Sequence, residues 1–138
     1  MTFAGDGEPV RHGVVAVVIQ ERRFLIVRRA AGILAGGSWC FVGGGIEAGE
    51  TQAEALVREF REEVAGDIHP LRKVWEYQRP DGKLVLHWWL ARWRSAALCA
   101  NPREVAQIAW LTTDEIERLP GVLPSNIEFI QAVGRTLV

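Results

Sequence analysis

The sequence predicts one α/β domain in which a mixed β-sheet lies between helices. Three observations carry this prediction. A nearly continuous run of β-branched residues at 13–19 is typical of a strand buried on both faces. A glycine cluster then leads into an amphipathic helical pattern over 52–64, and a strong turn signal at 79–82 separates two further strands. Strands, a helix, a hairpin and more helices, in that order, suit a sheet with helices on both faces.

The composition fits a single globular domain over 1–138, with a loose N-terminus over 1–10. Of the 138 residues, 49% are hydrophobic and 24% are charged, which allows a sizeable core. The formal net charge of −1 gives no electrostatic footprint for a nucleic-acid polymer, so no nucleic-acid polymer is expected as a partner.

Cys40 and Cys99 lack metal or redox spacing and indicate reduced thiols in a cytoplasmic protein. No apolar run reaches membrane-spanning length, and the chain is expected to be a monomer or a homodimer.

The first strand, 13–19, should be central because it is apolar on both faces. A turn at 21–23 leads to a second strand at 24–27, which ends at two arginines. The connection over 30–38 contains three glycines and is expected to be a mobile loop at the border of a site.

The helix over 52–64 has a clear start signal. Thr51 followed by Glu54 predicts a capping box, so the helix should begin near Gln52. Apolar positions at helical spacing predict its buried stripe: Ala53, Leu56, Val57, Phe60 and Val64.

Further strands are predicted at 68–77 and 84–93, joined by the turn at 79–82, and a short strand at 108–111. Alternation places His87 and Trp89 on one face of the second of these strands, and Trp88 on the other. Most tryptophans are expected to pack in the core, and no chemistry is assigned to the three histidines. Thr113 is expected to cap a helix at 114–119, and helical spacing predicts a last helix over 125–134.

Three carboxylates on the 52–64 helix suggest a metal site. Glu59, Glu62 and Glu63 are spaced i, i+3, i+4, so their side chains should lie on one ridge and repel one another by about 0.2–0.5 kcal/mol per pair. Arg58 and Arg61 could neutralise a solvated ridge, which is the simpler interpretation. The adjacent glycines favour a different cation, because carboxylates and exposed carbonyls are ligands of Mg²⁺ and Mn²⁺.

The run 44–66 resembles the Nudix box, G-x5-E-x7-R-E-U-x-E-E-x-G-U, where U is a bulky apolar residue. Seven positions match it: Gly44, Glu50, Arg58, Glu59, Phe60, Glu62 and Glu63. Three positions depart from the pattern. Ala65 replaces the final glycine, Gly66 replaces the last apolar residue, and Val42 stands where many members have proline. Gly66 is therefore expected to serve as the C-cap, displaced by one residue.

This resemblance implies the Nudix α/β/α sandwich and a hydrolase. Residues 75–77, 89–93 and 123–126 extend the likeness to the MutT-type nucleotide hydrolases. The implied substrate is a small nucleotide, NDP-X, most favourably a nucleoside triphosphate or an oxidised (8-oxo) purine triphosphate. The implied products are a nucleoside monophosphate and pyrophosphate or X-phosphate. Mg²⁺ or Mn²⁺ would be held by the carboxylates of the ridge and by the Gly44 carbonyl.

The resemblance also assigns roles outside the metal ridge. Glu50 and Arg58 would pair and pin the glycine loop to the helix, or they form an ordinary surface pair. Arg29 would lie in the nucleotide site, although arginines at a strand end are often only solvated. The general base would be Glu104 or Glu62, because Gln107 and Ala109 stand where family members often carry the late glutamate.

Asn126 has two interpretations. The MutT-type likeness makes it a base-reading amide with donors and an acceptor. Its place after Pro-Ser at the start of a helix also suits an N-cap.

Two other classes of protein remain open at this stage. One is a catalytically silent Nudix-fold module that only binds a nucleotide. The other is a dinucleotide-binding oxidoreductase, because residues 43–48 satisfy G-x-G-x-x-A between a strand and a helix. Glu47 and Glu50 argue against the oxidoreductase, because they would repel a pyrophosphate at that helix start.

Overall fold

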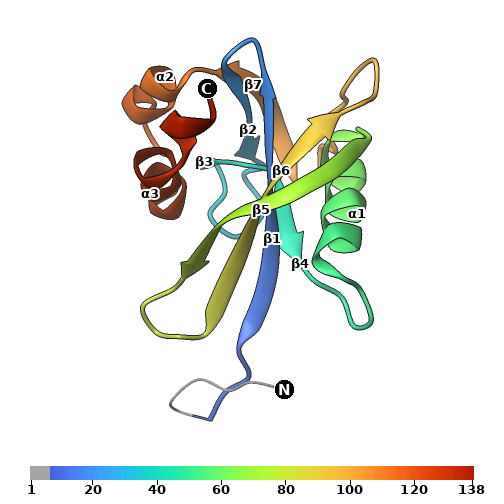
Figure 1. Ribbon diagram of the computed structural model, residues 1–138, viewed down its shortest axis with the longest axis vertical. Helices are drawn as coiled ribbons and strands as arrows, with labels where there is room; N and C mark the ends of the chain where they lie inside the picture. The colour runs from blue at the N-terminus through green and yellow to red at the C-terminus, as the bar shows by residue number, and fades with distance from the viewer. Residues whose placement is uncertain (1–6) are drawn as a thin grey trace.

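The computed structural model describes residues 7–138 (Figure 1), so residues 1–6 of the predicted N-terminal segment lie outside the described part. The strands are β1 (Arg11–Gln20), β2 (Arg23–Arg29), β3 (Trp39–Cys40), β4 (Gly43–Gly45), β5 (Ile68–Gln78), β6 (Leu84–Trp93) and β7 (Val105–Leu111). The helices are α1 (Gln52–Val64), α2 (Thr113–Arg118), α3 (Pro124–Ala132) and the 3₁₀ turn η1 (Gly134–Leu137). Within residues 7–138, none of these helices has the length and apolar character that crossing a bilayer requires.

The sheet is mixed, as predicted, and β1 is its centre. The path through the sheet is β3-β2-β1-β6-β5, with β7 beside β2 and β4 beside β1. β1 runs parallel to β6, whereas its pairings with β2 and β4 are antiparallel. Since β6 occupies one edge of β1, β4 and β2 share the other edge, at Gly13–Val15 and Ile19–Gln20 respectively. The two strands therefore pair with different parts of β1.

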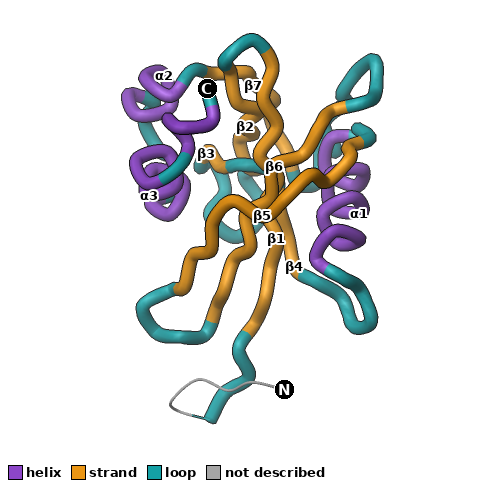
Figure 2. The backbone as a smooth tube through the Cα atoms, in the orientation of Figure 1, coloured by secondary structure: helices purple, strands orange, loops and turns teal. Residues whose placement is uncertain are grey.

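Helices cover both faces of the sheet, with α1 on one side and α2 and α3 on the other (Figures 1 and 2). Alternate residues of β1 therefore enter two separate cores. Val14, Ala16 and Val18 pack in the core that includes Leu56 and Phe60 of α1. Val15 and Val17 pack in the core that includes Phe129 and Ile130 of α3. Burial on both faces explains why the strand is apolar without alternation.

The β5–β6 hairpin follows the sequence prediction. Arg79 N–H donates to Leu84 O at 2.9 Å and Gly82 N–H donates to Arg79 O at 2.8 Å, which closes the turn. On β6, Trp89 packs on the α1 side, whereas Trp88 is fully buried on the α3 side.

Helix α1 begins as predicted, but its buried face is rotated. Thr51 and Glu54 form both hydrogen bonds of the capping box. Ala53 and Val57 are only half-buried, however, whereas Ala55 and Glu63 are buried. The predicted stripe is confirmed at Leu56, Phe60 and Val64, and Val57 packs against the same core although it is only partly buried. The burial of Ala55 and Glu63 was not predicted.

The C-cap of α1 is Ala65, not Gly66 as the sequence predicted. Ala65 adopts the left-handed conformation, with φ 53° and ψ 30°. Gly66 is needed for a different reason, because a Cβ atom there would overlap the Phe60 ring and the Leu98 side chain.

The other helix starts also differ from the prediction. Thr112, not Thr113, caps α2 and forms a capping box with Glu115. α3 begins at Pro124 after Leu123, and no side chain caps it. Proline suits the first helical position because its fixed φ is already helical and its missing N–H needs no partner there.

Candidate functional site

The glycine strand β4 lies directly against α1. Gly43 N–H donates to Glu63 Oε2 at 3.1 Å. A Cβ atom on Gly44 would overlap the Glu59 carboxylate, so only glycine allows this close approach. Glu59 and Glu63, one turn apart on the helix, are thereby fixed against two successive residues of the strand.

Arg58 ties the loop after β4 to the helix, in agreement with the predicted pair. Its Nε donates to Glu50 Oε2 at 2.7 Å and its Nη2 to Glu50 Oε1 at 2.9 Å. Nη2 also donates to Gly45 O at 2.9 Å, so the backbone of β4 is held as well. The bidentate hydrogen bond from Arg58 lowers the pKa of the Glu50 carboxyl and raises the pKa of the guanidinium.

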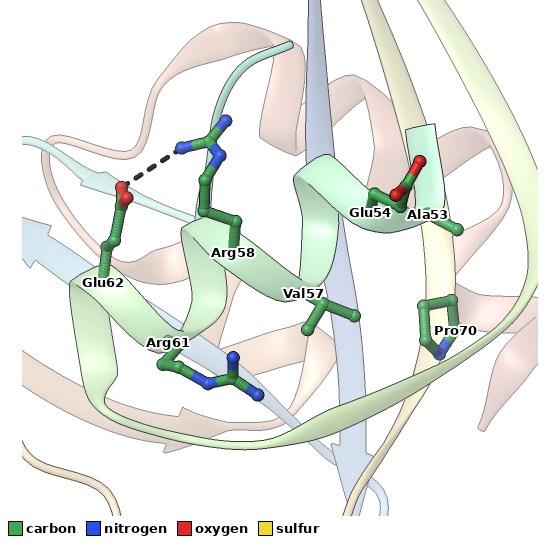
Figure 3. Close-up of a pocket in the computed structure, with 7 residues that line it drawn as sticks. All are labelled: Ala53, Glu54, Val57, Arg58, Arg61, Glu62 and Pro70. Carbon is green, nitrogen blue, oxygen red and sulfur yellow. Dashed lines mark hydrogen bonds and ion pairs between the residues drawn. The ribbon is translucent and has the colours of Figure 1, made fainter. Parts of the chain in front are cut away.

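The carboxylates of the ridge lie in different environments. Glu63 is 8% exposed, and burial, aided by the negative charges of Glu59 and Glu104, raises its pKa to about 8. Burial also raises the pKa of Glu59, against the lowering effect of Arg58. Glu62 remains 53% exposed and forms a 3.2 Å ion pair with Arg58 Nη1 (Figure 3).

The predicted three-carboxylate convergence is not formed in residues 7–138, where no group of three His, Cys, Asp or Glu side chains meets the geometry of a metal site. The donor set nevertheless fits a hard divalent cation. Burial raises the pKa values of both Glu59 and Glu63, the charge of Glu59 raises that of Glu63 further, and a cation would compensate the negative charge.

Glu104 lies near the ridge, as one of the two predictions for the base requires. Asn101 N–H donates to Glu63 O at 2.8 Å, which holds the loop before β7 against the end of α1. Ala30 N–H donates to Glu104 O at 2.9 Å on the other side of that loop. The charge of Glu104 accordingly raises the pKa of both Glu59 and Glu63.

A cavity of about 180 Å³ is lined by residues of β1, β2, β4, β6 and α3. It brings together the two predicted substrate residues, Arg29 and Asn126, with Gly43 and Gly44. Arg29 comes from the end of β2, and its Nε donates to Leu34 O at 2.9 Å. Residues almost 100 positions apart in the chain thus line one cavity beside the carboxylate ridge.

Asn126 does not cap a helix, so that interpretation is wrong. It is the third residue of α3 and is 5% exposed. Its Oδ1 accepts a hydrogen bond from Phe41 N–H at 3.0 Å, and its Nδ2 donates to Ser125 Oγ at 3.2 Å.

Sequence reasoning missed two features around this site. Cys40 also lines the cavity, where burial raises the pKa of its thiol despite the neighbouring Arg29. His12 Nδ1 and His87 Nε2 lie 2.9 Å apart, and Lys73 Nζ lies 2.8 Å from His87 Nδ1. No spacing in the sequence signals this contact, which follows from the parallel β1–β6 pairing.

A second cavity, of about 640 Å³, lies between α1 and β5 (Figure 3). Val57 and Pro70 extend toward it from the two elements, and Arg58 and Glu62 lie at one rim. This groove contains neither of the predicted substrate residues.

The fold and the site define a class: an α/β/α sandwich with an acidic helix and a glycine strand beside a cavity lined by Arg29 and Asn126. A single parallel strand pair, β1–β6, among the described strands does not make the doubly wound sheet of a dinucleotide-binding oxidoreductase. The chain matches the NUDIX domain family over residues 9–133 and belongs to that family.

Similar proteins support this assignment. The chain is 30% identical over 121 residues to the CTP pyrophosphohydrolase of Escherichia coli (strain K12), covering 86% of this chain and 87% of that protein. It is 32% identical, over an alignment of 158 positions, to the RNA pyrophosphohydrolase of Erythrobacter litoralis (strain HTCC2594), and the alignment covers 94% of this chain and 93% of that protein. The crystal structure of the MutT protein from Methanosarcina mazei Go1 has a TM-score of 0.78 at 21% identity, covering 94% and 96%. The chain is therefore a hydrolase of the Nudix family with a MutT-like fold.

Proposed function

We propose that the protein hydrolyses a phosphoanhydride bond in a nucleoside diphosphate linked to a further group, with Mg²⁺ or Mn²⁺ as its cofactor. The favoured substrate is a nucleoside triphosphate, including an oxidised (8-oxo) purine triphosphate, which water converts to a nucleoside monophosphate and pyrophosphate. One observation carries this proposal. Glu59 and Glu63 are held against β4 at the edge of the cavity that contains Arg29 and Asn126.

The residues that would hold the cation are Glu59, Glu62, Glu63 and the Gly44 carbonyl. The ion pair between Glu62 and Arg58 is half-exposed, and such pairs are worth about 0–1 kcal/mol, so it does not bar Glu62 from this role. When bound, the cation would neutralise phosphate charge and make a water molecule more acidic.

The chain's own residues orient the substrate and move the proton. Arg29 presents a guanidinium in the cavity, which suits a phosphate oxygen. The Arg58–Glu50 pair keeps the Gly45 carbonyl and the following loop in place. Glu104 or Glu62 would accept a proton from the attacking water, since both lie close enough for their charges to raise the pKa of Glu59.

A substrate panel tests this proposal. Purified protein is given CTP, dGTP, 8-oxo-dGTP, a dinucleoside polyphosphate and a 5′-triphosphate RNA with Mg²⁺ or Mn²⁺. Phosphate is measured after coupling to pyrophosphatase for the triphosphates and to a phosphatase for the dinucleoside polyphosphate, whose products are nucleotides. The RNA is included because one relative is named for that substrate. We expect turnover of at least one triphosphate, and a fall of roughly 10²-fold or more in Glu59→Gln and Glu62→Gln.

Glu128→Gln is the matched control, because Glu128 is an exposed glutamate on α3 that does not line the cavity. It should retain full activity. Full activity of the two ridge variants, or a protein inert toward every diphosphate offered, would contradict the proposal.

A further inference from the structure

Three successive residues, Phe41, Val42 and Gly43, are each hydrogen-bonded to a different element. Phe41 N–H donates to Asn126 Oδ1 of α3 at 3.0 Å. Val42 O accepts from Ala16 N–H of β1 at 2.8 Å. Gly43 N–H donates to Glu63 Oε2 of α1 at 3.1 Å. The segment that carries Gly43 and Gly44 is therefore fixed by α3, β1 and α1 in turn.

Of these three bonds, two depend on a buried side chain, Asn126 or Glu63, and the bond to Asn126 is the one outside the carboxylate ridge. Phe41 is 3% exposed and lies between β3 and β4, outside both strands. Asn126 is 5% exposed. A buried N–H that loses its acceptor is costly, so the segment would have to move to find another partner.

The orientation of the Asn126 amide follows from the same contact. A backbone N–H can only donate, so the amide oxygen must face Phe41 and the amino group must face Ser125. The oxygen of Asn126 is thus engaged by the protein itself before any substrate arrives.

We propose that Asn126 is a positioning residue that sets the 41–44 segment so that Gly43 and Gly44 meet Glu63 and Glu59. This inference rests on the proposed function, because it assigns Asn126 an effect on turnover through β4 in addition to any contact with a base. A base-reading residue acts mainly on the affinity for one base. A positioning residue acts on the rate with every substrate, since the glycine strand and the carboxylates are common to all.

Two substitutions of Asn126 separate these roles. Asn126→Ala removes the acceptor for Phe41 N–H, and we expect kcat to fall about tenfold for every triphosphate that the wild-type protein hydrolyses. Asn126→Asp keeps an oxygen at the same distance along the side chain, so it should restore most of kcat while KM changes with the base. If Asn126→Ala instead changes KM for one base alone, or if Asn126→Asp is as slow as Asn126→Ala, the positioning role is refuted.

Hydrogen exchange of the Phe41 amide gives a readout that needs no turnover. We expect the Phe41 amide to be protected in the metal-free wild-type protein and in Asn126→Asp, and to exchange at least tenfold faster in Asn126→Ala. Ile130→Val is the matched control, because it removes one buried methyl group from the same helix without touching the Phe41 hydrogen bond. It should lower the melting temperature without selectively exposing Phe41.

The two measurements also separate failure of this inference from failure of the proposed function. A protected Phe41 amide in Asn126→Ala would overturn the positioning role even in an active enzyme. Wild-type protein that hydrolyses no diphosphate, together with the expected exchange pattern, would overturn the proposed activity and leave the Asn126–Phe41 anchor in place.

Discussion

The carboxyl group of Glu63 is buried between Gly43 and two other carboxylates, and its pKa is raised to about 8 from an ordinary value of 4.5. A raised pKa means that the folded protein favours the neutral carboxyl group. The contribution of the Glu63 carboxyl group to the free energy of unfolding is therefore fully present below about pH 4.5, and it is lost as the pH rises through about 8. At neutral pH, part of this stabilisation is therefore already lost in the metal-free protein.

Glu63→Gln should remove this pH dependence. The amide keeps an acceptor for Gly43 N–H and never ionises, so the variant should be more stable than wild type above pH 8, on the order of a few kcal/mol. The two proteins should converge near pH 4.5. Thermal unfolding in EDTA between pH 4.5 and 9 measures the difference, and parallel melting curves for the two proteins across that range would contradict the electrostatic account.

For single residues, sequence spacing could place the three carboxylates on one side of α1 but could not predict how buried each one is. The i, i+3, i+4 pattern puts Glu59, Glu62 and Glu63 on neighbouring positions whatever the rest of the chain does. It could not show that Glu63 is buried and Glu62 exposed, because this depends on how the helix is rotated against β4. The proximity of Glu104 depends on the same long-range packing, since it comes from the loop before β7.

The start of α2 and the end of α1 show how far local sequence signals determine helix boundaries. Thr112-x-x-Glu115 is a complete capping box, so the sequence did contain the correct signal for α2, one residue before the predicted cap. The end of α1 is different. A glycine at 66 was the expected left-handed residue, but Ala65 takes that conformation, and Gly66 instead leaves room for Phe60 and Leu98.

Ala65→Gly should stabilise the protein at this helix end. A non-glycine residue with φ 53° is strained by its Cβ atom, and glycine at this position relieves the strain at some cost in chain entropy. We expect a net gain of about 0.5–1 kcal/mol and unchanged kcat, because Ala65 contacts neither β4 nor the cavity. Urea unfolding of both proteins measures the gain, with Ala31→Gly in the exposed 30–38 loop as a control without a left-handed backbone.

For the whole molecule, the predicted layers and the mixed sheet are confirmed, whereas the arrangement that creates the site could not be predicted from local patterns. The prediction of a buried central strand follows from the apolar run at 13–19 alone. The sharing of one edge of β1 by β4 and β2 involves pairings that local patterns do not encode. The cavity is lined by residues of β1, β2, β4, β6 and α3, so Arg29 and Asn126 could be named from the family resemblance but not placed together.

The charge at the site also makes the stability of the whole domain depend on the cation. Glu59 and Glu63 repel each other and Glu104 in the metal-free protein, and a divalent cation bound only by the folded chain relieves that repulsion. Mass action then adds about 2.7 kcal/mol to the free energy of unfolding at a cation concentration 100 times Kd.

We expect Mn²⁺ and Mg²⁺ to raise the melting temperature of wild type and of Glu128→Gln by several degrees at pH 8, and to leave the melting temperature of Glu63→Gln nearly unchanged. An equal rise in Glu63→Gln would place the cation elsewhere on the protein, and no rise in wild type at millimolar cation would mean that this carboxylate ridge does not bind it without substrate.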